Sequence, residues 1–197
     1  SFSVKLLPGN HASLPTTTKR PVLSSRVNLL TYSEDFSNVA WSTNLYDAGT
    51  LTKTTGVAGP DGSLTAVRIQ ATAPTASPAT GAVLRNGTVL SLVTARTFWA
   101  KSNTGGNQVI TDNASANKFT VTPTWTEYAR TQSASIHYLF EIGVYRSGTA
   151  SDTDATCDIT IWHPQTNYGP TALPYQRITT ATNYDTEGFP LYLKGDG

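Results

Sequence analysis

Apolar and polar residues alternate along the middle of this chain, and Gly, Pro and Asn residues interrupt the alternation. Interruptions about 8–12 residues apart are typical of β-sandwiches, in which short strands follow one another through tight turns. No segment carries the apolar stripe of a helix of three turns. We therefore predict an all-β fold, a two-sheet antiparallel jelly-roll β-sandwich over residues 27–180. Its clearest strands are expected at 64–70, 96–101, 108–111, 118–122, 125–131, 136–146 and 156–163.

The alternation assigns each side chain to one face of its strand, because successive residues point to opposite sides of a sheet. In segment 136–146 it places Ile136 and Tyr138 on the core face and Leu139 on the outer face. Cys157 shares the face of Ile159 and Ile161, which predicts a buried and unreactive thiol. The predicted core, with Trp125 largely buried beside it, consists of Val67, Ile69, Phe98, Phe119, Val121, Phe140, Ile142, Ile159 and Ile161.

Large aromatic side chains occur on faces that the alternation predicts to be polar. The apolar C–H faces of sugars stack on such rings, and nearby polar side chains hydrogen-bond the sugar hydroxyls. The alternative is that the terminal segments or a neighbouring subunit cover these rings. The candidate ligand-binding residues are Trp99, Lys101, His137, Glu141, Tyr145 and Trp162.

The two ends of the chain differ from its middle. Residues 1–26 are predicted to form an extended N-terminal arm, because prolines interrupt a segment with too little apolar content to fold alone. We expect this arm to lie on a neighbouring protein in a homo-oligomer, a trimer in the first instance. Residues 181–197 are predicted to be a C-terminal tail or the start of a truncated further domain.

Charge and cysteine content argue against several classes of function. The formal net charge is +1 and no basic stripe is present, so nucleic-acid binding is not expected. No apolar run reaches membrane-spanning length, so membrane insertion is not expected. The single cysteine, Cys157, excludes an internal disulfide and a multi-cysteine zinc site.

Catalytic motifs are not recognisable either. None of the three histidines, His11, His137 and His163, lies in a nucleophile–base motif. The carboxylates are scattered, whereas a glycosidase needs two that face one cleft. Glu127 and Glu141 are expected to be solvated on polar strand faces. We therefore expect a protein without enzymatic activity.

Five segments stand out in their order along the chain: NLLTYSEDF (28–36), GPDGSLTAVRI (59–69), TFWAKS (97–102), FTVTPTWTEYART (119–131) and IWHPQTNYGPTALPYQRITT (161–180). Together they resemble the carbohydrate-binding-module-like jelly-roll domains of phage tail fibres and minor structural proteins. The chain departs from that pattern at His163-Pro164, where small residues are usual, and at Thr166-Asn167, where Leu-Glu is usual.

The resemblance implies an extracellular virion module of a tail or fibre, for host attachment or glycan binding, whose N-terminal arm contacts other virion proteins. It also implies a structural calcium with ligands at Glu34, Asp35 and Asp158; the alternative is that such Asp side chains only hydrogen-bond their own turns. No other cofactor is expected. Two further functions stay open, because one fold hosts many functions: a structural adaptor, decoration or spacer, and an accessory domain of a polysaccharide-degrading enzyme.

Overall fold

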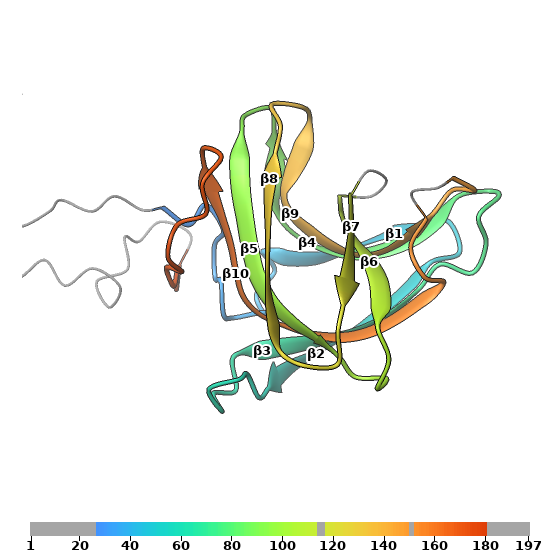
Figure 1. Ribbon diagram of the computed structural model, residues 1–197, viewed down its shortest axis with the longest axis horizontal. Coiled ribbons are helices and arrows are strands. Elements are labelled where there is room, and N and C mark those ends of the chain that lie inside the picture. Colours follow the sequence, from blue (N-terminus) through green and yellow to red (C-terminus); the bar gives the residue numbers. More distant parts are fainter. Residues whose placement is uncertain (1–26, 114–116, 150–151, 181–197) are drawn as a thin grey trace, which may run out of the picture.

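The computed structural model describes residues 27–113, 117–149 and 152–180, and within them the fold is all-β, without a helix. Two antiparallel five-stranded sheets pack face to face (Figure 1). Sheet A has the order β1-β4-β9-β6-β7, and sheet B has the order β2-β3-β10-β5-β8. The predicted jelly-roll β-sandwich is confirmed. The strands are β1 (Trp41–Tyr46), β2 (Thr50–Val57), β3 (Ala66–Thr72), β4 (Thr80–Leu90), β5 (Thr94–Ser102), β6 (Gln108–Asn113), β7 (Asn117–Val121), β8 (Thr126–Gln132), β9 (His137–Arg146) and β10 (Thr156–Tyr168).

All seven segments predicted from the alternation are strands, but three further strands were not predicted. The edge strand β2 is rich in threonine and has little apolar content. The central strand β4 begins with five consecutive buried residues, Thr80–Leu84. A strand buried on both faces shows a continuous run in place of a period of two, so the alternation is lost.

The core lies between the two sheets and contains the predicted residues with two exceptions. Eight of the nine predicted core residues are almost fully buried. Phe119, on the edge strand β7, is only partly buried and packs against the core cluster. Trp125 is partly buried, but its ring lies beside the Lys101 ammonium and not in the core cluster.

The predicted alternation fails at the start of β9. Ile136 precedes the strand and is 76% exposed, although it was assigned to the core. Leu139 packs against the core, whereas the guanidinium of Arg85 lies 3.4 Å from the ring centroid of Tyr138. A bulge in β4 lies opposite this part of β9, where the register shifts between Asn86 and Val89. Leu139 and Tyr138 therefore have the opposite of their predicted environments.

A buried charge cluster connects the two sheets. Arg96 of β5, in sheet B, donates hydrogen bonds to the backbone carbonyl oxygens of Asp112 and Tyr138 in sheet A. Its Nη1 lies 3.7 Å from the Asp112 carboxylate, and the two side chains are 1% and 3% exposed. Arg130 approaches the other carboxylate oxygen at 3.5 Å. Two guanidinium groups thus surround one carboxylate that water does not reach.

The sandwich is curved, and its described ends lie close together. Figure 1 shows β4 and β9 bending along their length, so that the outer face of sheet A is concave. The side chain of Asn28 donates hydrogen bonds to the carbonyl oxygens of Pro164 and Gln176, which joins the first described residues to the closing segment. The predicted arm 1–26 and tail 181–197 lie outside the described residues. No helix able to cross a membrane occurs in the described part of the chain.

Cys157 is expected to resist thiol reagents in the native state. Its side chain is 3% exposed, and burial raises the pKa of the thiol to about 12, so almost no thiolate is present at neutral pH. A chromogenic disulfide reagent should label it slowly in buffer and rapidly in concentrated urea. Complete labelling of the native protein within seconds would contradict the observed register of β10.

Candidate functional site

The candidate residues identified from the sequence lie on opposite faces of the sandwich. Trp99, Lys101 and Trp162 lie on the outer face of sheet B, whereas Glu141 and Tyr145 lie on the concave outer face of sheet A. The sixth, His137, is buried near one end of β9. The structure therefore presents two separate surfaces in place of one site.

On the concave face of sheet A, the candidate Tyr145 lies beside a second aromatic residue, Tyr46, which the sequence pattern did not identify. Tyr46 of β1 and Tyr145 of β9 both pair with Gly81 of β4, so the three residues form one row across the sheet. The two rings meet edge to face, with centroids 5.4 Å apart and an interplanar angle of 85°. This is a favourable arrangement for aromatic pairs.

Gly81 is what allows the two rings to approach each other. A Cβ atom at this position would lie 2.7 Å from Cδ2 of Tyr145 and 3.2 Å from Cδ2 of Tyr46. The first distance is shorter than van der Waals contact, so any side chain here would push the rings apart. A glycine between two aromatic residues of neighbouring strands thus belongs to the site.

A charged pair lies further along the same concave face. Arg85 of β4 is paired with Glu141 of β9, and its Nε and Nη2 donate to one carboxylate oxygen at 2.8 and 2.5 Å. Nη2 also donates to the hydroxyl of Tyr46 at 3.0 Å. Burial and the Glu141 carboxylate raise the pKa of Tyr46, which keeps the phenol protonated. The pair leaves the face polar but without net charge.

Two of the candidate residues have environments that differ from the prediction. Glu141 was expected to be solvated, yet it is fully buried beneath Arg85. His137 is 2% exposed, and its Nδ1 donates to the carbonyl oxygen of Ser135, so Nε2 accepts from the Thr94 hydroxyl. Burial lowers the pKa of His137. Both ring nitrogens of His137 are thus hydrogen-bonded within the protein, and its imidazole is almost fully enclosed.

The outer face of sheet B holds the two predicted tryptophans. Trp99 is half-buried, and the Trp162 ring meets it edge to face with centroids 6.4 Å apart. Trp162 is 8% exposed and donates a hydrogen bond from Nε1 to the Thr65 hydroxyl. The strand continues beyond Trp162 through a bulge at His163 and does not end there. The chain itself covers Trp162, and no other subunit is needed to do so.

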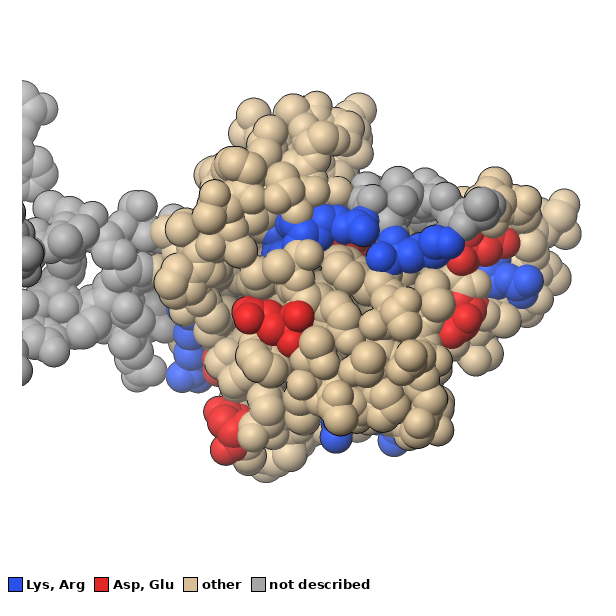
Figure 2. Space-filling model, viewed as in Figure 1, with Lys and Arg blue, Asp and Glu red and all other residues tan. Residues whose placement is uncertain are grey.

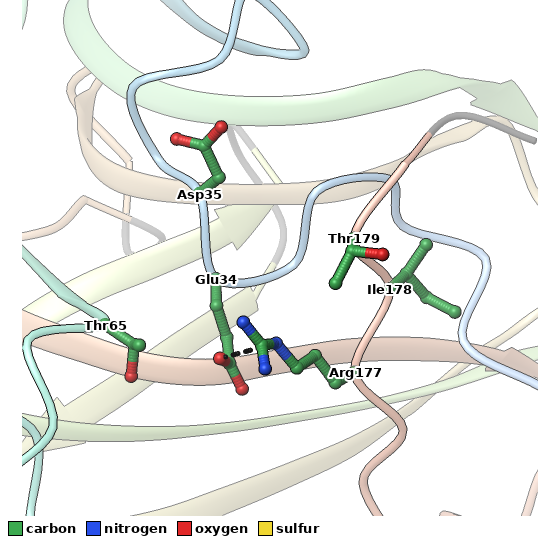
Figure 3. Close-up of a pocket in the computed structure, with 6 residues that line it drawn as sticks. All are labelled: Glu34, Asp35, Thr65, Arg177, Ile178 and Thr179. Carbon is green, nitrogen blue, oxygen red and sulfur yellow. Dashed lines mark ion pairs between the residues drawn. The ribbon is translucent and has the colours of Figure 1, made fainter. Parts of the chain in front are cut away.

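The residues predicted to bind calcium lie in two places. Figure 3 shows a pocket of about 210 Å³ in which Glu34 points toward Arg177, whereas Asp35 points away from it. The Glu34 carboxylate accepts from Arg177 Nε at 3.0 Å and lies 3.1 Å from His163 Nε2, while the Tyr175 hydroxyl donates to it at 3.2 Å. Two nitrogen donors and one hydroxyl donor surround this carboxylate, but calcium binds six or more oxygens.

Asp158 lies on sheet B and is held by other partners. Arg68 donates to both of its carboxylate oxygens, and the side-chain amides of Gln70 and Asn103 donate to it as well. Asp35 accepts from the backbone and hydroxyl of Ser37, as expected of a turn. Among the described residues, no group of three His, Cys, Asp or Glu side chains is placed to hold a metal. The residues present do not fit the calcium site that the resemblance implies.

The Glu34 cluster is expected to make the stability of the protein depend on pH. Burial alone would raise the pKa of Glu34, but the hydrogen bond with His163 and the charge of Arg177 lower it below its usual value. A carboxyl whose pKa is lower in the folded state stabilises the fold above its unfolded pKa, near 4.3, and loses this contribution as the pH falls. Melting temperatures of the Glu34→Gln variant should therefore fall less between about pH 5 and pH 3 than those of the wild type.

The exposed Glu127 provides the control for this experiment. Glu127→Gln tests for the general effect of removing a surface carboxylate, because the Glu127 side chain forms no hydrogen bond or ion pair with another residue of the described ranges. Parallel curves for wild type and Glu34→Gln would show that the cluster does not stabilise the fold through the ionised carboxylate.

The charge on the molecular surface is sparse. Figure 2 shows one side of the molecule as mostly uncharged, with Lys and Arg atoms gathered in a short band where Figure 1 draws β6 to β8. Asp and Glu atoms lie close to the band, so this side has no broad field of one sign. Recognition through extended charge attraction is not expected at such a surface.

No protein-family model and no curated protein matches this chain. Solved structures with partial similarity include the CBM22-1 and GH10 modules of endo-1,4-β-D-xylanase 10B from Clostridium thermocellum, complexed with xylohexaose (16% identity, TM-score 0.42, 77% of this chain and 30% of that one). The enzymatically active domain of tailspike protein 4 from bacteriophage CBA120 has 16% identity and a TM-score of 0.38 (73% of this chain, 22% of that one). The family 11 carbohydrate-binding module from C. thermocellum, in complex with a β-1,3-1,4-mixed-linked tetrasaccharide, has 12% identity and a TM-score of 0.43 (76% and 100%).

This chain spans less than a third of the length of the first two structures. Identities of 12–16% and TM-scores of at most 0.43 are too low to assign a family or a function to it. The assignment of a function therefore depends on the two surfaces described above.

Proposed function

We propose that this chain is a non-catalytic glycan-binding module and that the concave face of sheet A holds the glycan. The observation that carries the proposal is the pair Tyr46 and Tyr145, placed edge to face over Gly81 beside the Arg85–Glu141 ion pair. Aromatic faces stack on the C–H groups of a pyranose, and the guanidinium and phenol groups provide hydrogen bonds for its hydroxyls. No covalent chemistry is required of these residues.

The charge balance of the face supports a neutral glycan as the ligand. The positive charge of Arg85 is compensated by Glu141, which accepts two of its hydrogen bonds. This pair offers no uncompensated positive charge to an acidic sugar. It also offers no uncompensated carboxylate to a cationic ligand. From Gly81 to Arg85 the face extends about 13 Å along β4, because a strand rises roughly 3.3 Å per residue. That length suits a short oligosaccharide.

Removing either tyrosine ring is expected to weaken glycan binding. Tyr145→Ala and Tyr46→Ala should each cost about 1–3 kcal/mol, roughly a ten- to hundredfold loss of affinity. Affinity electrophoresis in gels containing neutral polysaccharides, such as xylan, mixed-linked β-glucan or galactomannan, measures this directly. Tyr168→Ala is the matched control, since Tyr168 is 57% exposed near the end of β10. Equal retardation of all three variants by a polysaccharide that retards the wild type would contradict the proposed site.

The biological setting is part of the proposal and rests on the five sequence segments. In that setting the module lies outside the cell, on a tail or fibre of a virion, and glycan binding attaches the particle to its host. Other virion proteins would then bind the N-terminal arm, and the module would form a homotrimer. An accessory domain of a polysaccharide-degrading enzyme would require the same binding surface. Only the protein that contains the module would differ.

A structural adaptor is the second candidate, and one feature favours it. Apolar side chains are exposed at the end of the sandwich where β4 turns into β5 and where β9 begins: Val89 is 45% exposed, Leu92 52% and Ile136 76%. Val89 is paired with Tyr138, two residues after Ile136, so these side chains share one end of the molecule. Light scattering of the wild type and of Ile136→Asp would show whether this end holds subunits together.

A further inference from the structure

We infer that the outer face of sheet B is a second glycan-binding platform, built on Trp99 and separate from the concave face of sheet A. It extends the proposed function, because each chain would then bind two neutral glycan segments on opposite sides. The inference rests on the tryptophans of this face, two charged side chains beside them and a cavity further along the same strands.

Tryptophan is distributed unequally over the two sheets. The chain contains four tryptophans, and Trp41 is the one in the core, at 2% exposure. The other three gather on sheet B: Trp162 is paired with Trp99, and the Lys101 ammonium lies 5.3 Å from the ring centroid of Trp125. By contrast, the aromatic residues described for the concave face of sheet A, Tyr46 and Tyr145, are tyrosines.

Trp162 supports the platform, and Trp99 is its contact surface. Trp162 is nearly enclosed by its hydrogen bond to Thr65 and by the His163 ring, which stacks on it with centroids 3.2 Å apart. The His163 ring stacks in turn on Tyr175. The edge-to-face contact with this fixed ring restrains Trp99, which lowers the side-chain entropy that Trp99 would lose on binding.

Two charged side chains flank Trp99 without an ion-pair partner among the described residues. Lys101 follows it by two residues on the same face of β5, and Glu127 of β8 is directly paired with it. Neither Lys101 nor Glu127 forms an ion pair with another residue in the described ranges. A Lys ammonium donates to a sugar hydroxyl, and a carboxylate accepts from one. Since the two charges cancel, this pair suits a neutral pyranose stacked on Trp99.

The platform continues along β5 and β8 into a cavity of about 200 Å³. The residues that line it include Ala95, Ala129, Thr131 and Pro170. The Thr131 hydroxyl donates a hydrogen bond to the Pro170 carbonyl oxygen at 2.7 Å. Between Trp99 and Ala95 the strand extends about 13 Å. In the row between them, Thr97 is paired with Ala129 on one side and with Gln165 on the other. Thr97 is 8% exposed and Ala129 is exposed, so a glycan that runs from the ring to the cavity would pass over the β8 side of this row.

Tryptophan fluorescence separates this platform from the site on sheet A. Neutral oligosaccharides of glucose, mannose, galactose, xylose and rhamnose should be titrated into the full chain, with stoichiometry measured by calorimetry. A ligand on sheet B should shift the tryptophan emission, whereas a ligand on the tyrosines of sheet A should not. For an oligosaccharide bound by both faces, we expect two per chain in the wild type and one per chain in Trp99→Ala and in Tyr145→Ala.

Each outcome decides between the two sites. If Trp99→Ala leaves the stoichiometry and the emission shift unchanged, the inference is wrong, and the proposed function still stands if Tyr145→Ala abolishes binding. If Tyr145→Ala has no effect but Trp99→Ala abolishes binding, only the platform on sheet B is supported. No emission shift with any of these sugars also overturns the inference.

Two further variants cover the case that Trp99→Ala does not fold. Lys101→Ala and Glu127→Gln remove the flanking groups without opening the core, and each should reduce the emission shift at a fixed sugar concentration several-fold. Circular dichroism should be the same for both variants and for the wild type. If both bind like the wild type, the platform does not use these groups and the inference fails.

Discussion

Replacing Phe140 by alanine is expected to lower the free energy of unfolding by about 3–5 kcal/mol. Phe140 is 2% exposed and lies between the sheets, where its ring meets Trp41 and Phe98 edge to face at centroid distances of 5.8 and 5.9 Å. Truncation would remove the contacts of a whole ring and leave a cavity that neighbouring β-strands fill poorly, since backbone pairing holds them in place. Urea unfolding followed by tryptophan fluorescence measures the loss.

Val39→Ala is the matched control for this prediction. Val39 is 94% exposed, so its truncation should change the stability by less than about 0.5 kcal/mol. A loss of less than about 1 kcal/mol for Phe140→Ala would mean that this part of the core is not packed as described.

Replacing Asp112 by alanine is expected to destabilise the protein by a similar amount, about 3–5 kcal/mol. Arg96 is 1% exposed, and removal of Asp112 would leave its charge buried without a carboxylate, since water cannot enter to solvate it. The hydrogen bonds from Arg96 to the backbone carbonyl oxygens of Asp112 and Tyr138 do not involve the removed carboxylate, so the expected loss comes from the unpaired charge.

The double variant Arg96→Met/Asp112→Leu tests this explanation. Replacing both partners of a buried ion pair by apolar residues of similar volume is often neutral or stabilising, because no charge remains to be solvated. The double variant should therefore be more stable than Asp112→Ala. If it is less stable, the hydrogen bonds of Arg96 to the backbone matter more than the burial of its charge.

The candidate residues differed in how far the sequence could predict them. Trp99, Lys101 and Trp162 were predicted to face outward, because residues 97–101 and 157–162 alternate regularly and a period of two suffices to assign their faces. The concave face was missed apart from Tyr145 and Glu141. Its other residues, Tyr46 and Arg85, lie on β1 and β4, which the alternation did not reveal. The signal for this face that the sequence offered was Gly81, a glycine among the apolar residues at the start of β4.

The local sequence determined seven of the ten described strands and most of the core. Alternation of apolar and polar residues is a property of each segment by itself, so the seven strands, the all-β class and the burial of Cys157 followed without knowledge of the partners. Gly and Pro residues determined turns in the same local way, because each favours particular backbone dihedral angles.

The tertiary structure decided which side chains meet. The curvature of sheet A and the pairing of β1, β4 and β9 bring Tyr46 and Tyr145 together, although the two residues are remote in the sequence. The partners of charged groups were decided in the same way: Glu141 is buried because Arg85 is its cross-strand neighbour, and Glu34 has Arg177 and His163 where calcium was expected. Strand order and register fix these contacts, and the period of two in the sequence carries no information about which strands become neighbours.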